Sequence, residues 1–241
     1  PDADRLIAQK GYFVIHAPRQ TGKTTAMLEL AHQLTASGKY VAALVSMEVG
    51  AAFNDDPGTA ESAILDDWRR TADWQLPPEL QPPAWPPAEP GARIRSALQA
   101  WAKAAPCPLL LFLDEIDALQ DLALISVLRQ LRAGYAGRPK AFPSSLALIG
   151  MRDVRDYKVA SGGSNRLNTA SPFNIKVRSL TLSNFKEDEV SALYRQHIQE
   201  TGQAFSPEAM KLAFDLTQGQ PWLVNALAKI VTEELDRKSA V

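Results

Sequence analysis

The chain has 241 residues with 26 basic and 27 acidic side chains, and its formal net charge of −1 gives no general reason to expect nucleic-acid binding. Apolar residues make up 46%, which suits a globular protein with a core, and the single cysteine, Cys107, excludes an internal disulfide framework. No apolar run is long enough to span a membrane and no basic-then-apolar signal opens the chain, so we expect a soluble, cytoplasmic protein without membrane contact.

A strand, a tight loop and a helix are predicted to follow one another near the N-terminus. The strand Tyr12–His16 is apolar, and the loop after it contains Ala-Pro-Arg-Gln-Thr-Gly-Lys-Thr-Thr over residues 17–25. The helix from about Lys23 to Ser37 points its N-terminus, with unpaired N–H groups and a positive dipole end, at the same loop. This order and the Gly-Lys-Thr spacing predict a loop that binds the phosphates of a nucleoside triphosphate with Mg²⁺.

Each residue type in this loop has a predicted role. Gly22 lets the backbone approach a phosphate without a Cβ in the way, and Lys23 supplies an ammonium group for the outer phosphates. Thr24 offers its hydroxyl to Mg²⁺, and Thr25 is expected to donate to the inner phosphates. Ala17 stands where the motif has its first glycine, and we expect the proline after it to hold the turn. The predicted nucleotide-binding residues of the loop are Pro18, Arg19, Gln20, Thr21, Gly22, Lys23, Thr24 and Thr25.

Apolar strands and helical stretches continue to alternate after this loop. Residues 40–47 contain the continuous apolar run of a central parallel strand, and residues 59–74 have the apolar spacing of a helix. Seven prolines fall within 77–90, a density that no regular helix or strand tolerates. We favour a surface linker of polyproline character for this segment over a docking segment that would use Trp85.

Two carboxylates end the third predicted strand, Leu109–Leu113, which follows a helix over 92–104. Open α/β sheets place ligands at the carboxyl ends of their strands, so we expect Asp114 beside the phosphate loop, holding Mg²⁺ through water. Glu115 is expected to orient and deprotonate an attacking water molecule. An acidic N-cap for the next helix is the alternative interpretation of this pair.

The remaining elements complete an α/β core and a helical C-terminal part. We expect strands over 146–150 and 173–182, and helices over 122–133, 186–200, 206–216 and 222–235. The alternation predicts a P-loop NTPase core, an α/β fold whose five-stranded parallel sheet is flanked by helices. The predicted organisation is a nucleotide-binding core over 1–182, with 77–90 as a proline-rich insertion, and a small helical lid over 183–241.

These motifs carry a resemblance to a known family. The run Asp114-Glu115-Ile116-Asp117 after an apolar strand resembles the second nucleotide motif of AAA+ and STAND-type P-loop ATPases. The loop over 16–25 resembles that of prokaryotic AAA-like ATPases in which Pro-Arg-Gln-x-Gly-Lys-Thr recurs and the first glycine is often replaced, as at Ala17. The resemblance covers most of the chain and implies ATP as the nucleotide, with Mg²⁺ as its cofactor.

The resemblance implies roles for three further positions. Arg152, after the strand over 146–150, is similar to an arginine that faces the terminal phosphate in STAND ATPases, and a surface salt bridge is its alternative role. Gly219-Gln220-Pro221 is similar to the Gly-x-Pro motif of that class, whose proline packs near the base, and it also has the pattern of a helix stop and restart. Arg166 lies where AAA+ proteins often present an arginine to a neighbouring subunit's nucleotide; Arg129, Arg132 and Arg138 are competing candidates, and an exposed arginine without a role is the alternative.

The leading hypothesis is Mg²⁺-dependent ATP binding and hydrolysis coupled to a conformational change. Its catalytic residues are Glu115, Lys23 and Arg152, its metal ligands are Thr24 and Asp114, and Pro221 contacts the base. An alternative is a slow ATP/ADP switch that acts through an effector protein or as a homo-oligomer. No effector domain is visible after residue 235, so under this hypothesis we expect the chain to be a fragment of a longer protein. A DNA-associated loader or motor is the third hypothesis, and the near-neutral charge does not support a nucleic-acid partner.

Overall fold

The computed structural model describes residues 2–151 and 176–235. These residues fall into two compact units. The first consists of Pro1–Ala17 and Thr24–Thr181, and the second of Pro18–Lys23 and Leu182–Val241. The short loop between the first strand and its helix therefore groups with the C-terminal helices.

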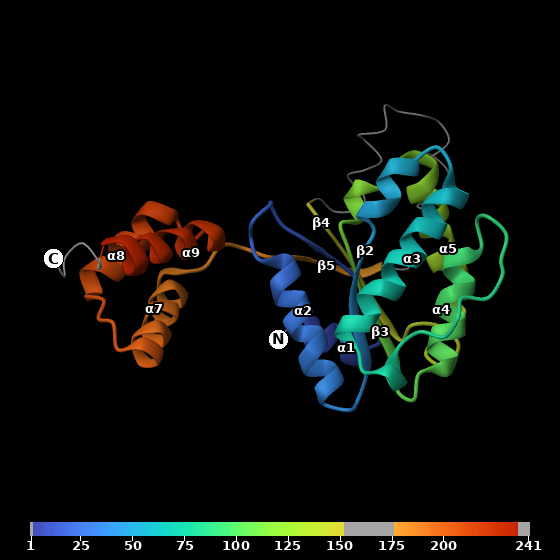
Figure 1. The fold of residues 1–241 in the computed structure, drawn as a ribbon, viewed down its shortest axis with the longest axis horizontal. Coiled ribbons are helices and arrows are strands. Elements are labelled where there is room, and N and C mark those ends of the chain that lie inside the picture. The colour runs from blue at the N-terminus through green and yellow to red at the C-terminus, as the bar shows by residue number, and fades with distance from the viewer. Residues whose placement is uncertain (1, 152–175, 236–241) are drawn as a thin grey trace. The chain divides into compact units, whose positions relative to one another are not determined.

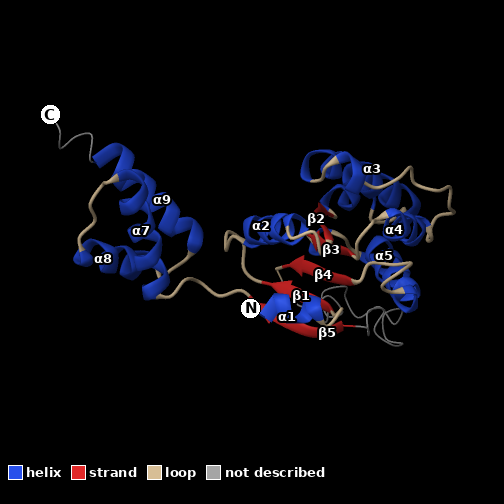
Figure 2. Cartoon of the chain, turned by 90° about the horizontal axis from the view of Figure 1, so that it is seen from below, coloured by secondary structure: helices blue, strands red, loops and turns tan. Residues whose placement is uncertain are grey.

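A five-stranded, entirely parallel sheet is the centre of the first unit, which confirms the predicted α/β fold class. In spatial order the strands are β2 (Val41–Ser46), β3 (Leu109–Asp114), β4 (Ser145–Gly150), β1 (Tyr12–His16) and β5 (Lys176–Thr181), as Figure 2 shows. Since all strands are parallel, their carboxyl ends lie at one edge of the sheet. Residues that end β1, β2 and β3 can therefore form one site.

Helices flank both faces of the sheet. The flanking helices are α1 (Asp2–Ala8), α2 (Lys23–Ala36), α3 (Pro57–Gln75), α4 (Arg93–Ala104) and α5 (Asp121–Gly134). Figure 1 shows α2 on one side of the strands and α3, α4 and α5 on the other. The short helix α1 was not predicted, because its two buried apolar residues, Leu6 and Ile7, give too little periodicity.

Burial on both faces explains why the strands β1 to β4 are almost continuously apolar. In β2, Val41, Ala43 and Val45 pack in one cluster with side chains of α3, α4 and α5. The alternate residues Ala42 and Leu44 are buried as well, and successive strand residues point to opposite faces. A strand covered on both faces has no polar side, which is typical of parallel sheets.

The proline-rich segment 77–90 packs on α3 and α4. It contains one 3-10 turn, Pro78–Leu80, and no other regular element. Trp85 is half-buried, and its indole N–H donates to the Leu65 carbonyl of α3 at 2.9 Å. The Arg69 guanidinium donates to the Pro83 carbonyl at 2.7 Å and lies 5.3 Å from the Trp85 ring centroid. The segment is thus a fixed strap across two helices, with Trp85 turned toward the core, and differs from the linker that its composition suggested.

The second unit is built mainly from three helices around a small core. They are α7 (Glu187–Thr201), α8 (Pro207–Thr217) and α9 (Pro221–Lys229), and a π-helical turn, Ile230–Leu235, continues α9. Its buried apolar residues are Val190, Tyr194, Met210, Ala213 and Val224. As predicted, Pro207 opens the first turn of α8, and the Ser206 hydroxyl caps it by accepting from the Ala209 N–H at 3.1 Å. Within residues 2–151 and 176–235, no helix has the length and apolar character needed to cross a membrane.

Candidate functional site

The loop after β1 begins where the sheet ends. The Ala17 N–H donates to the Gly150 carbonyl at the end of β4 at 3.2 Å, and Ala17 is buried. Ala17 is not among the described residues with a positive φ, so this position does not need glycine. An alanine therefore fits at the first position of the loop motif.

The loop Pro18–Lys23, in the second unit, has hydrogen bonds between its own residues. The Pro18 carbonyl accepts hydrogen bonds from the Thr21 hydroxyl at 2.9 Å and from the Lys23 ammonium at 2.7 Å. Gln20 and Gly22 have φ values of +62° and +77°. A Cβ on Gly22 would meet no atom within 4 Å, so its glycine is required by the left-handed backbone and not by crowding.

The hydroxyl and the carboxylate predicted to hold Mg²⁺ are hydrogen-bonded to each other. Thr24, in the first turn of α2, donates through Oγ1 to Asp114 Oδ2 at 2.6 Å. Asp114 ends β3, is 6% exposed, and accepts the Glu115 N–H at its other oxygen at 2.9 Å. Hydroxyl and carboxylate oxygens are the donors that Mg²⁺ takes from proteins, so this pair fits the ion chemically.

No cluster of three or more His, Cys, Asp or Glu side chains in the described ranges could hold a metal ion by itself. A magnesium ion at Thr24 and Asp114 would therefore need water and ligand oxygens to complete its coordination. Mg²⁺ is usually bound in this way, by one or two protein oxygens together with substrate phosphates.

Glu115 is held in an unusual backbone conformation beside this pair. Its φ is +56°, in the left-handed region that costs a residue with a Cβ about 1–2 kcal/mol. Its carboxylate accepts the Ser46 hydroxyl at 2.9 Å. Burial raises the pKa of the Glu115 carboxyl above its usual value, the Ser46 hydrogen bond opposes this rise, and the charges of Glu48 and Asp114 add to it. Such strain is found where a side chain must point in one direction.

Sequence reasoning missed Ser46 and Glu48. Ser46 ends β2 and pairs in register with Asp114, and its hydroxyl also accepts the Glu48 N–H at 3.0 Å. An ionised carboxylate can only accept, so the Ser46 hydroxyl donates its proton to Glu115 while its oxygen accepts the Glu48 N–H. The signal was present in the sequence, since Ser46 is the polar residue that ends an apolar strand. The prediction of a central position for this strand was wrong, because β2 lies at the edge of the sheet and owes its apolar character to helices that cover it.

The other predicted site residues are placed as follows. Arg19 and Thr25 are exposed, and Pro221 is buried at the first turn of α9. Gly219 has a φ of +66°, and its carbonyl accepts the Phe185 N–H at 2.8 Å, within the second unit. Arg152 and Arg166 lie outside the described residues, so their predicted roles stay predictions.

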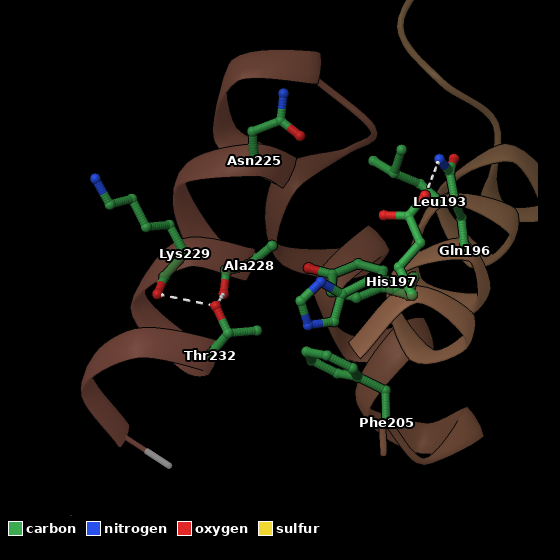
Figure 3. Close-up of a pocket in the computed structure, with 10 residues that line it drawn as sticks. Leu193, Gln196, His197, Phe205, Asn225, Ala228, Lys229 and Thr232 are labelled. Carbon is green, nitrogen blue, oxygen red and sulfur yellow. Dashed lines mark hydrogen bonds between the residues drawn. The ribbon is translucent and has the colours of Figure 1, made fainter. Parts of the chain in front are cut away.

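A separate cavity lies within the second unit, where Figure 3 shows side chains of α7 facing those of α9. Its volume is about 290 Å³, and the rings of His197 and Phe205 are 5.9 Å apart between centroids. None of the predicted phosphate- or magnesium-binding residues lines it. The lining residues are Leu193, Tyr194, Gln196, His197, Glu200, Phe205, Asn225, Ala228, Lys229 and Thr232.

Comparison with solved structures identifies proteins of the same fold, whereas no protein-family model and no curated protein matches the chain. A Walker-type ATPase of Pyrococcus abyssi has a TM-score of 0.66 at 12% identity, over 96% of this chain and 66% of that one. The ORC2 protein of Aeropyrum pernix, in ADPNP–ADP complexes, has a TM-score of 0.59 at 17% identity, over 98% and 60%. Domain III of the replication initiation protein DnaA of Thermotoga maritima has a TM-score of 0.56 at 10% identity, over 98% and 83%.

These TM-scores show a shared fold, and identities of 10–17% do not by themselves show a shared activity. The chain spans 66% of the length of the Walker-type ATPase and 60% of that of ORC2.

Proposed function

We propose that the chain binds ATP with Mg²⁺ and hydrolyses it, and that hydrolysis changes the conformation of the C-terminal helices. The observation that carries this proposal is the 2.6 Å hydrogen bond between Thr24 and Asp114. It joins the hydroxyl that follows Gly-Lys to the carboxylate that ends a central strand, at the sheet edge where α/β proteins bind ligands. The fold shared with structures solved with ADPNP and AMPPCP supports the same nucleotide.

The proposed roles follow the chemistry of each side chain. Lys23 and the amides of Arg19, Gln20 and Thr21, with Thr25, hold the phosphates, and Thr24 and Asp114 hold Mg²⁺. Bound Mg²⁺ supplies positive charge to the phosphate oxygens. Glu115 orients a water molecule for in-line attack and accepts its proton, a role helped by a carboxylate that Ser46 keeps in one place. Catalysis would come mainly from positioning and charge stabilisation.

We propose further that residues 1–182 act as the nucleotide-binding core and residues 183–241 as a lid. In this scheme Arg152 senses the third phosphate, and Pro221 contacts the base. The Gly219 carbonyl accepts the N–H of Phe185, which lies just before α7. A change in backbone conformation over Gly219–Pro221 would therefore move the start of α7. A cytoplasmic location is part of the same proposal.

Titration with a fluorescent ATP analogue, with and without Mg²⁺, tests the proposed function. We expect the wild-type chain to bind and Lys23→Ala to lose binding, because its ammonium is the group proposed to hold the outer phosphates. Lys39→Ala, which removes an exposed lysine after α2, is the matched control and should bind as the wild type does. Tight binding by Lys23→Ala would contradict the site.

A slow ATP/ADP switch is the second candidate, and exposed apolar side chains favour it. Leu212, Leu216 and Trp222 of the second unit are 57%, 64% and 52% exposed, as expected of a surface that binds a partner. Sedimentation with ATP, with ADP and without nucleotide tests whether this surface drives self-assembly. Turnover well under about one per minute without a partner, far below the range of ordinary enzymes, would favour the switch over the ATPase of the first proposal.

A DNA-associated role rests on the neighbours alone, since one is a DNA replication initiation factor. The net charge of −1 does not support it. If DNA binding were found, its affinity should fall steeply as the salt concentration rises.

A further inference from the structure

Gln220 makes two hydrogen bonds with the two ends of its side-chain amide, both within the second unit. Its Oε1 accepts the Leu223 N–H at 2.6 Å and so caps the N-terminus of α9. Its Nε2 donates to the backbone carbonyl of Gln20, in the phosphate loop, at 3.2 Å. One side chain therefore joins the start of a helix to a loop residue 200 positions away in the sequence.

The carbonyl that accepts from Gln220 belongs to Gln20, a loop residue with a strained backbone. Gln20 has a φ of +62° although it carries a Cβ, a conformation that needs support from its surroundings. The Thr21 hydroxyl and the Lys23 ammonium donate to the Pro18 carbonyl, whereas the Gln20 carbonyl accepts from the Gln220 amide. The amide of Gln220 thus fixes the direction of the peptide that follows Gln20.

A glutamine is an uncommon residue for this position. Helix N-caps favour Ser, Thr, Asp and Asn, whose short side chains reach the N–H groups of the first turn. Glutamine is longer, and the extra length lets the amide oxygen cap α9 while its NH₂ group extends to the loop. The cap alone does not explain the choice of residue, whereas the second hydrogen bond does.

We propose that Gln220 is a positioning residue that holds the phosphate loop in its nucleotide-binding conformation and links loop occupancy to the first turn of α9. This inference rests on the proposed function, because it assigns Gln220 a part in the same ATP site. If this hydrogen bond stabilises the loop conformation that binds nucleotide, bound nucleotide must stabilise the hydrogen bond by the same free energy, because the two equilibria are linked. ATP should therefore protect the amides of the α9 first turn from exchange.

The test compares Gln220→Ser with the wild type by ATP titration and by hydrogen exchange with and without Mg·ATP. Serine keeps a cap acceptor but is too short to reach Gln20, so the unfolding midpoint should stay near that of the wild type. We expect the Kd for ATP and the KM to rise about two- to tenfold, the equivalent of one hydrogen bond, with kcat unchanged. In the variant, ATP should protect the loop but no longer the first turn of α9.

Two controls separate the possible results. Gln196→Ala removes an exposed glutamine of α7 that donates to Glu200, and it should bind ATP as the wild type does. Gln220→Ala removes the cap as well and should lower the unfolding midpoint in addition to weakening ATP binding. Wild-type ATP affinity and α9 protection in Gln220→Ser would overturn the inference while leaving the proposed function intact. Absence of ATP binding by the wild type would overturn both.

Discussion

The Thr24 hydroxyl donates to the Asp114 carboxylate across 2.6 Å, although 90 residues separate them in the sequence. The bond connects the first turn of α2 to the end of β3, an interior strand of the sheet. Asp114 is nearly buried, and its second oxygen accepts the Glu115 N–H. One carboxylate therefore fixes the hydroxyl proposed to bind Mg²⁺ and the backbone of the residue proposed to position water.

Asp114→Asn should lower the response of ATP turnover to Mg²⁺. The amide keeps the shape of the side chain but loses the negative charge, and loss of a group that holds a metal through water costs about 10–100-fold in metal affinity or activity. A magnesium titration of the hydrolysis rate measures this. Asp117→Asn, two positions beyond Glu115, is the control and should titrate like the wild type. An unchanged magnesium dependence in Asp114→Asn would remove Asp114 from the metal site.

Gly219→Ala should destabilise the second unit more than Gly202→Ala does. Both glycines have left-handed φ, +66° and +76°, so both changes carry a similar backbone cost of about 1 kcal/mol. A Cβ at Gly219 would lie 1.9 Å from the Phe185 carbonyl oxygen, whereas one at Gly202 would meet nothing within 4 Å. The clash should add about 1–3 kcal/mol, measured as a difference in urea unfolding free energy. Equal losses would contradict the close approach of Gly219 to Phe185.

Glu61→Ala should unfold the first unit more readily by about 3 kcal/mol, because it leaves several buried donors without an acceptor. Glu61 is 1% exposed and accepts from the Gly91 N–H, the Ser126 hydroxyl and the Gln130 amide at 2.7–3.1 Å. Thermal and urea unfolding measure the loss. Glu61→Gln keeps one acceptor oxygen, so its unfolding free energy should lie between those of the wild type and of Glu61→Ala. Glu79→Ala, at an exposed position, should change the unfolding free energy by less than about 0.5 kcal/mol.

Trp85→Ala should lower the unfolding free energy by about 2–3 kcal/mol, because it removes a partly buried ring and its hydrogen bond. The ring lies 6.1 Å from that of Trp101, and its N–H donates to the Leu65 carbonyl. Trp74→Ala serves as the control, since that ring is 65% exposed and should contribute less than about 0.5 kcal/mol. Similar losses from the two substitutions would show that the strap over 77–90 is not anchored by Trp85.

The sheet could be predicted because the strands β1 to β4 are buried on both faces, which leaves continuous apolar runs such as Leu109–Leu113. The strap over 77–90 could not, because its prolines exclude regular structure without saying whether the segment packs. Its contacts depend on single long-range partners, such as the Leu65 carbonyl for Trp85. Composition contains no information about such a partner.

In the site, too, local sequence patterns predict some residues, whereas tertiary contacts place the others. A local pattern, strand followed by Gly-Lys-Thr, located Thr24, and a strand followed by two carboxylates located Asp114. The roles of Ser46 and Gln220 depend on tertiary hydrogen bonds, to Glu115 and to the Gln20 carbonyl. Their residue types are ordinary, so only the fold brings them to the site.

The most direct test of the proposed ATPase is a paired measurement of ATP binding and ATP turnover in Glu115→Gln. The amide keeps the size of the side chain but cannot accept a proton from water, and loss of a general base costs about 10²–10⁴-fold in rate. We predict that Glu115→Gln binds Mg·ATP with an affinity close to that of the wild type and loses at least about 10²-fold in turnover. Unchanged turnover with retained binding would contradict the assignment of Glu115 and, with it, the proposed hydrolytic site.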